Sequence, residues 1–288
     1  MGGTAQGTGV SQDGPGDQGA GAARRVTATL DVDVTAPTTL ELQVAVARLD
    51  GLHVQESLTC TLDGAPVQVR EVAGPEGTRG HVLESAPGAL RMAYSATVTG
   101  QAAPAPVSDR DRRVYSRPSR YAPSDAMAGY ATKELAGLPA GPELLTAVSA
   151  WVSQRLSYVP GSSGPTDGAV ETLLGGAGVC RDYAHVTIAM LRALDVPARL
   201  VAVYAPGCAP MDFHAVTEAA VGDTWYVLDP TGLAPRSALL RISTGRDAAD
   251  TAFLTNHGGA VQLHGSEVTA VVDGDLPRDR VDQPAVLR

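Results

Sequence analysis

The sequence has few aromatic residues, few basic residues and no long apolar run. Aromatic residues make up 4% of the 288 positions although 44% are hydrophobic, so the cores must consist mainly of Ala, Val and Leu. No run of about 18 apolar residues occurs, so we expect no membrane-spanning helix. Lysine and arginine total 22 against 31 acidic residues. The net charge of −9 therefore excludes nucleic acid and anionic lipid from the expected partners.

Cysteine is also scarce. Cys60, Cys180 and Cys208 are odd in number and irregularly spaced, which excludes a disulfide framework and indicates a reducing compartment. The stretch 1–23 lacks the basic and apolar regions of a signal peptide, and its many glycines predict a flexible tail. We therefore expect a cytoplasmic protein.

The length suggests about two domains. Residues 24–105 contain short alternating segments such as VTATLDVDV, separated by turn residues, and this pattern predicts an antiparallel β-sandwich-like domain. Residues 106–120 are rich in Pro and Arg and are interpreted as a linker. Residues 121–288 mix helical and strand-like periodicities, so the chain as a whole is predicted to be an α+β protein.

One segment of the second domain, GGAGVCRDYAHVTIAML, carries candidate chemistry. Its glycines allow close backbone approach, and a helix is expected over residues 179–194, with Cys180 at its start. The positive end of a helix dipole and its unpaired N–H groups favour a thiolate, which is the nucleophilic form of cysteine, and the same groups can hold an oxyanion. The alternative is a small buried cysteine, which is the usual fate of free cysteine.

A nucleophilic cysteine needs a base, and six histidines are present. His185 follows Cys180 by five residues, so it points some 140° away around the helix and is expected to pack or to support other residues. His214 is better placed, in the strand-like run FHAVTEAAV.

The strand of His214 also predicts a partner for it. Gly222-Asp223 between two apolar runs is a two-residue hairpin signal. In the register that this turn favours, Asp229 lies opposite Val216 and therefore on the same face as His214, one diagonal step away. Turn chemistry alone thus predicts a His–Asp pair downstream of a helix-start cysteine, the arrangement of a Cys–His–Asp triad.

The blocks GVCRDYAH, DFHAV and WYVLDPT together resemble the transglutaminase-like superfamily, within the papain-related group of cysteine enzymes. The whole chain is similar to bacterial two-part members with an N-terminal β region. The resemblance implies a core in which the nucleophile helix packs on an antiparallel sheet. It also implies Cys180 as nucleophile, His214 as general base and acid, and Asp229 as the residue that orients the histidine, with no cofactor.

Three further residues are candidates for supporting roles or for the oxyanion site. Asp182 and Tyr183 follow Cys180 on the first helical turn, where Asp182 equally well stabilises the helix start. Tyr158, in the loop-like SYVPGSS, could line the cleft or pack in the core.

A zinc site is the main alternative chemistry for the same region. Cys180, His185, Cys208 and His214 are of the ligand types that zinc takes. None of them has the short paired spacing of structural zinc sites, so no metal is predicted.

The leading hypothesis is a cysteine acyl-transfer enzyme that acts on a peptide, a protein, or a small amide or thioester. Hydrolysis and amide-bond formation have the same residue requirements, so the sequence leaves both open. The alternative is a non-catalytic binding or scaffold module that retains the fold. The sequence gives no oligomeric state.

Overall fold

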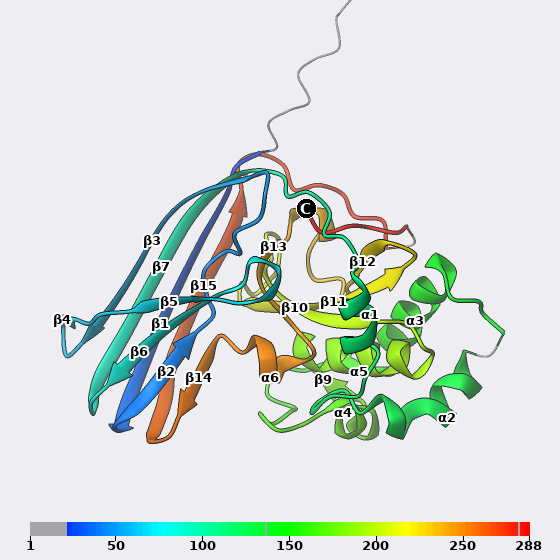
Figure 1. Ribbon diagram of the computed structural model, residues 1–288, viewed down its shortest axis with the longest axis horizontal. Coiled ribbons are helices and arrows are strands. Elements are labelled where there is room, and N and C mark those ends of the chain that lie inside the picture. Colours follow the sequence, from blue (N-terminus) through cyan, green and yellow to red (C-terminus); the bar gives the residue numbers. More distant parts are fainter. Residues whose placement is uncertain (1–21, 136, 282) are drawn as a thin grey trace, which may run out of the picture.

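The computed structural model describes residues 22–135, 137–281 and 283–288, so most of the expected N-terminal tail lies outside the described residues. A β-sandwich packs against a mixed helix–sheet core (Figure 1). The strands are β1 Arg24–Ala36, β2 Thr38–Leu42, β3 Leu52–Leu62, β4 Ala65–Pro66, β5 Arg70–Ala73, β6 Arg79–Ser85, β7 Gly88–Gly100, β8 Ser157–Tyr158, β9 Ala177–Gly178, β10 Ala198–Tyr204, β11 Phe213–Val221, β12 Thr224–Leu228, β13 Leu240–Gly245, β14 Leu254–His257 and β15 Ala260–Val272. The α-helices are α1 Asp109–Val114, α2 Ser124–Glu134, α3 Pro142–Arg155, α4 Ala169–Gly175, α5 Cys180–Ala193 and α6 Ala248–Thr251.

The sandwich has one sheet in the order β15-β1-β7-β3-β4 and a second in the order β14-β2-β6-β5. Strand β1 shows why it forms: its buried and exposed residues alternate along almost its whole length, as a strand with one buried face requires. The β-sandwich and the α+β class are therefore as expected from the sequence.

The chain division differs from the expected one. Strands β14 and β15 lie beyond residue 253 but complete the sandwich, where β15 pairs with β1 and β14 with β2. Without β15 and β14, strands β1 and β2 would be edge strands, each with one row of backbone N–H and C=O groups unpaired. Pairing of those groups is the physical reason that the C-terminal strands join the sandwich. The expected linker is also partly ordered, because Ser108 and Asp111 form a reciprocal capping box that starts α1.

The core sheet has the order β12-β11-β10-β13, all antiparallel. One face of this sheet is covered by α5, whose residues from Tyr183 to Leu191 are buried. The opposite face carries an apolar cluster that includes Val203, Val216 and Val227.

Sandwich and core share a continuous apolar contact. Tyr204 at the end of β10 is fully buried among sandwich residues, and its hydroxyl donates a 2.7 Å hydrogen bond to the Val44 carbonyl. The two parts therefore pack as one body at the end of the core sheet where β10 ends and β11 begins. Among the described helices, none is long and apolar enough to cross a membrane.

Candidate active site

Helix α5 begins at Cys180, as the sequence predicted, and its start is fixed by Asp182. The Asp182 carboxylate accepts a 2.8 Å hydrogen bond from the Val179 backbone N–H just before the helix. Gly178 is required at this turn, because a Cβ there would lie 2.6 Å from the Asp182 Cβ. The glycine-rich approach thus lets the chain turn tightly into a helix whose first residue is the candidate nucleophile.

The Cys180 side chain is half-buried and lies beside the first residues of β11. Its Sγ is 4.0 Å from the Phe213 carbonyl oxygen, and Cys180 is close enough to the adjacent His214 to help raise the pKa of that histidine. The start of α5 and the start of β11 therefore bring the cysteine and the histidine together. Because Asp229 occupies the Nε2 atom of His214, Nδ1 is the ring nitrogen that remains for Cys180.

The hairpin register is the one that the turn predicts. Val221 pairs with Thr224 and Thr217 with Leu228, and this places Asp229 just beyond the end of β12. His214 Nε2 and Asp229 Oδ2 lie 2.7 Å apart, and each side chain is 1% exposed.

The protonation of this pair follows from its contacts. Burial alone lowers the pKa of His214, but attraction to Asp229 and the hydrogen bond between them outweigh burial and hold that pKa well above its usual value. Burial alone raises the pKa of Asp229, but His214 and the Thr231 side chain and backbone lower it overall. The pair is therefore ionic at neutral pH, with an imidazolium turned toward Cys180.

Thr231 is a member of the site that the sequence reasoning missed. Its Oγ1 and its backbone N–H both donate to Asp229 Oδ1, at 2.6 and 3.1 Å. The signal was present, because Thr and Ser two residues after an Asp are common partners in local turns. Thr231 fixes one carboxylate oxygen while His214 takes the other.

Asp182 is fully buried and ties the loop after β8 to the nucleophile helix. Besides Val179, its carboxylate accepts from the Ser163 hydroxyl and from the Arg181 guanidinium at 2.8 Å. Asp182 therefore joins two segments, the loop at Ser163 and the helix start from Val179 to Arg181, next to Cys180.

The two candidate tyrosines differ in position. The buried Tyr183 hydroxyl donates to the Leu156 carbonyl at 2.7 Å, so this residue braces the end of α3. Tyr158 is 38% exposed, and its ring lies 6.1 Å, between centroids, from that of Tyr183. Burial and the neighbouring Cys180 raise the pKa of Tyr158, so it is a neutral hydroxyl near the candidate nucleophile.

His185 lies apart from this group, as its helical spacing predicts. Its ring is fully buried and stacks on Tyr121 with centroids 5.3 Å apart, and Nε2 accepts from the Ala248 N–H at 3.2 Å. Burial lowers the pKa of His185 to about 4. Within the described ranges, no group of three or more His, Cys, Asp or Glu side chains is arranged to hold a metal ion.

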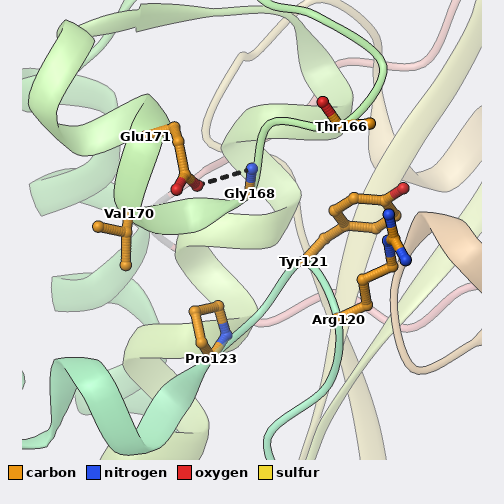
Figure 2. Close-up of a pocket in the computed structure, with 7 residues that line it drawn as sticks. All are labelled: Arg120, Tyr121, Pro123, Thr166, Gly168, Val170 and Glu171. Atoms are coloured by element: carbon orange, nitrogen blue, oxygen red, sulfur yellow. Dashed lines mark hydrogen bonds between the residues drawn. The ribbon is translucent and has the colours of Figure 1, made fainter.

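A cavity of about 390 Å³ lies outside the triad, where the segment before α2 approaches the start of α4. Figure 2 shows Arg120 and Tyr121 on one side of it and Glu171 on the other. The Glu171 carboxylate is held by the Gly168 N–H at 3.0 Å and so caps α4. None of Cys180, His214 and Asp229 lines this cavity.

Comparison with known proteins gives three results. The profile of the Transglutaminase-like superfamily matches residues 129–230. A solved structure from Cytophaga hutchinsonii, named "Putative Cysteine Protease", superposes with a TM-score of 0.83 at 31% identity, covering 90% of this chain and 94% of that one. An uncharacterized protein of Mycobacterium leprae is 27% identical over 154 residues, which are 48% of this chain and 52% of that protein. The chain thus spans about half the length of this curated relative.

Proposed function

Because the chain belongs to the transglutaminase-like superfamily, we propose that it is a cysteine-dependent acyl-transfer enzyme that acts on amide or thioester bonds. Cys180 is the nucleophile, His214 the general base and acid, and Asp229 the residue that orients the imidazole. The single observation that carries this proposal is the buried 2.7 Å contact between His214 and Asp229, on the histidine that follows Phe213, whose carbonyl oxygen lies 4.0 Å from the Cys180 sulfur.

In the first half of the reaction, the Cys180 thiolate attacks the carbonyl carbon of the substrate and a C–S bond forms. The negative charge that develops on the carbonyl oxygen needs donors in place beforehand. The Cys180 backbone N–H at the start of α5 and the neutral Tyr158 hydroxyl are suited to this role. The His214 imidazolium then gives its proton to the leaving amine or thiol as the C–N or C–S bond breaks, leaving a thioester on Cys180.

In the second half, neutral His214 takes a proton from water or from an amine, which attacks the thioester. The C–S bond breaks and the Cys180 thiolate is regenerated beside an imidazolium. Asp229 stays ionised throughout, because it stabilises the imidazolium in both halves. The chemistry uses only side chains and backbone groups of this chain.

The substrate that we propose is a peptide or protein in which an amide bond is hydrolysed. The name of the Cytophaga hutchinsonii relative supports this choice, and amide formation is the same chemistry with an amine in place of water. We also propose that the protein works in the cytoplasm. In support, Cys60, Cys180 and Cys208 are all free thiols, as a reducing compartment favours.

The experiment that tests the function uses a proteome-derived peptide mixture in ¹⁸O-water, with and without added glycine methyl ester. Hydrolysis places ¹⁸O in new carboxyl groups, and transfer produces glycine methyl ester amides; mass spectrometry separates the two products. Cys180→Ala is the control. Products that are equally abundant with Cys180→Ala would contradict the proposed function, and so would the absence of both products, which is the result expected of a non-catalytic module.

A further inference from the structure

The loop that carries Asp229 is closed at its base by a buried arginine. Asp229 begins this loop just after β12, and Arg236, at its other end, is 6% exposed. The Arg236 guanidinium reaches back across the loop and donates to the Val227 carbonyl at 3.2 Å. The two ends of the loop are therefore joined through one side chain.

Arg236 is held in turn by the C-terminal segment. Asp279 accepts from Arg236 Nε and Nη2, each at 2.9 Å, and from the Arg236 backbone N–H at 2.9 Å. Arg236 Nη2 also donates to the backbone carbonyls of Arg280 and Gln283. A two-oxygen pairing of this kind fixes both the position and the plane of a guanidinium.

The same segment continues along the outer edge of β12. The Val227 N–H donates to the Ala285 carbonyl at 2.8 Å, and β12 is an edge strand of the core sheet. Leu287 is buried in the apolar cluster that contains Val216, the residue two positions after His214 on β11. Residues 276–281 and 283–288, here named the C-terminal strap, therefore pack on the sheet face that carries His214 and Asp229.

The strap also touches the loop between β10 and β11. Gly207 has a φ of +96°, and a Cβ there would lie 2.9 Å from Leu276 Cδ1. This loop leads directly into Phe213 and His214. The strap thus contacts chain segments that flank both members of the His–Asp pair.

We propose that the C-terminal strap is a positioning element of the active site, in which Asp279 and Arg236 are positioning residues that hold Asp229 against His214. The line of contacts runs from Asp279 to Arg236, from Arg236 to the base of the loop, and from the loop through Asp229 to the imidazole. When the strap is released, the carboxylate loses its fixed geometry and water reaches the pair. Both changes weaken the imidazolium beside Cys180. This inference rests on the proposed function, because it assigns the strap a role in that same site.

The test compares Asp279→Asn with Asp273→Asn. Both aspartates follow β15 and accept two hydrogen bonds from the guanidinium of one arginine, but Asp273 pairs with Arg25 at the exposed edge of the sandwich. The measured quantity is the rate of Cys180 alkylation by iodoacetamide, followed by mass spectrometry at about pH 6.5 and about pH 10. At the lower pH the reaction depends on the thiolate–imidazolium pair, whereas at the higher pH thiolate forms without it.

The groups that act on His214 are Asp229 after β12, Cys180 on α5, and Asp212 and Cys208 in the preceding loop. All are unchanged in both variants. We expect Asp279→Asn to lower the ratio of the rate at low pH to that at high pH by about tenfold or more, and Asp273→Asn to leave it within about twofold. Asp279→Glu should restore part of the ratio.

Hydrogen exchange of the Val227 amide reports whether the strap is released. An unchanged ratio of the two alkylation rates in Asp279→Asn would overturn the proposal, whether or not this amide exchanges faster. An equal fall of that ratio in Asp273→Asn would also overturn it. If Asp279→Asn fails to fold, Arg236→Lys replaces it. This variant keeps the positive charge but cannot make the paired guanidinium contacts with Asp279, and we expect the same fall in the rate ratio. If Cys180 of the wild type does not react at the lower pH, the proposed function itself is contradicted. That outcome is seen in the wild type alone, whereas failure of the strap proposal is seen as equal ratios in the wild type and Asp279→Asn.

Discussion

His214 and Asp229 form a buried ion pair with 2.7 Å between Nε2 and Oδ2. The pKa of His214 is raised and that of Asp229 is lowered, so the pair stabilises the fold across neutral pH. The contribution of His214 is lost as the pH rises through its elevated pKa, and that of Asp229 is lost as the pH falls through its depressed one. The same pair keeps an imidazolium next to Cys180.

Asp229→Asn should slow acylation of Cys180 by about 10³-fold or more, because an amide holds the imidazole without stabilising its charged form. Stopped-flow release of p-nitrophenolate from p-nitrophenyl acetate measures the acylation rate. Asp223→Asn is the matched control, since Asp223 is on the same hairpin but its side chain is 93% exposed. Equal acylation rates in the two variants would show that Asp229 has no part in the reaction.

The three cysteines should differ strongly in reactivity. Burial raises the pKa of Cys60 to about 11 and also raises that of Cys208, so both stay protonated and shielded at neutral pH, whereas Cys180 faces an imidazolium. Iodoacetamide at neutral pH should label Cys180 first, and Cys180→Ser should remove the fast phase. Uniform labelling of all three thiols, as a binding module would give, is the contrary result.

Asp182 should matter for stability as well as for activity. Asp182→Ala removes the acceptor for Ser163, Arg181 and the Val179 N–H, so we expect the free energy of unfolding to fall by about 2–4 kcal/mol. Ser163→Ala removes one of these contacts and should cost about 1 kcal/mol. Urea unfolding followed by circular dichroism measures both, and a loss no larger for Asp182→Ala than for Ser163→Ala would refute the bracing role of Asp182.

Acid should destabilise the protein through His185. Its pKa is about 4 in the folded state and about 6.5 when unfolded, so the unfolded chain binds more protons between these values. Stability should therefore fall as the pH drops from about 6.5 to about 4, by about 3 kcal/mol from this residue.

His185→Gln offers an acceptor for the Ala248 N–H but cannot take up a proton. It should show a shallower loss of stability over the same pH range, measured as the urea midpoint. The exposed His257→Gln is the control. A pH dependence identical in His185→Gln and the wild type would contradict the assignment.

The parts of the site that could be predicted from the sequence are those set by local rules. The helix start at Cys180 follows from glycines and a first-turn acid, and the register of β11 and β12 follows from the turn at Gly222, whose φ is +59°. A two-residue turn leaves one favoured pairing, so His214 and Asp229 could be placed on one face before any coordinates were known.

The parts that could not be predicted depend on contacts between distant segments. Strand β15 pairs with β1 more than 200 residues away along the chain, and its alternating pattern does not specify the partner. Likewise, Arg236 and Asp279 meet only because the chain returns from the sandwich to β12. No local pattern around either residue specifies the other as its partner.

The central claim is that Cys180 forms a covalent acyl intermediate with help from His214 and Asp229. Intact-protein mass spectrometry after a short exposure to p-nitrophenyl acetate tests it most directly, with peptide mapping to locate the adduct. The account predicts one acetyl group on Cys180 in the wild type and none in Cys180→Ala. An adduct of equal yield in Cys180→Ala, or one located on a different residue in the wild type, would contradict it.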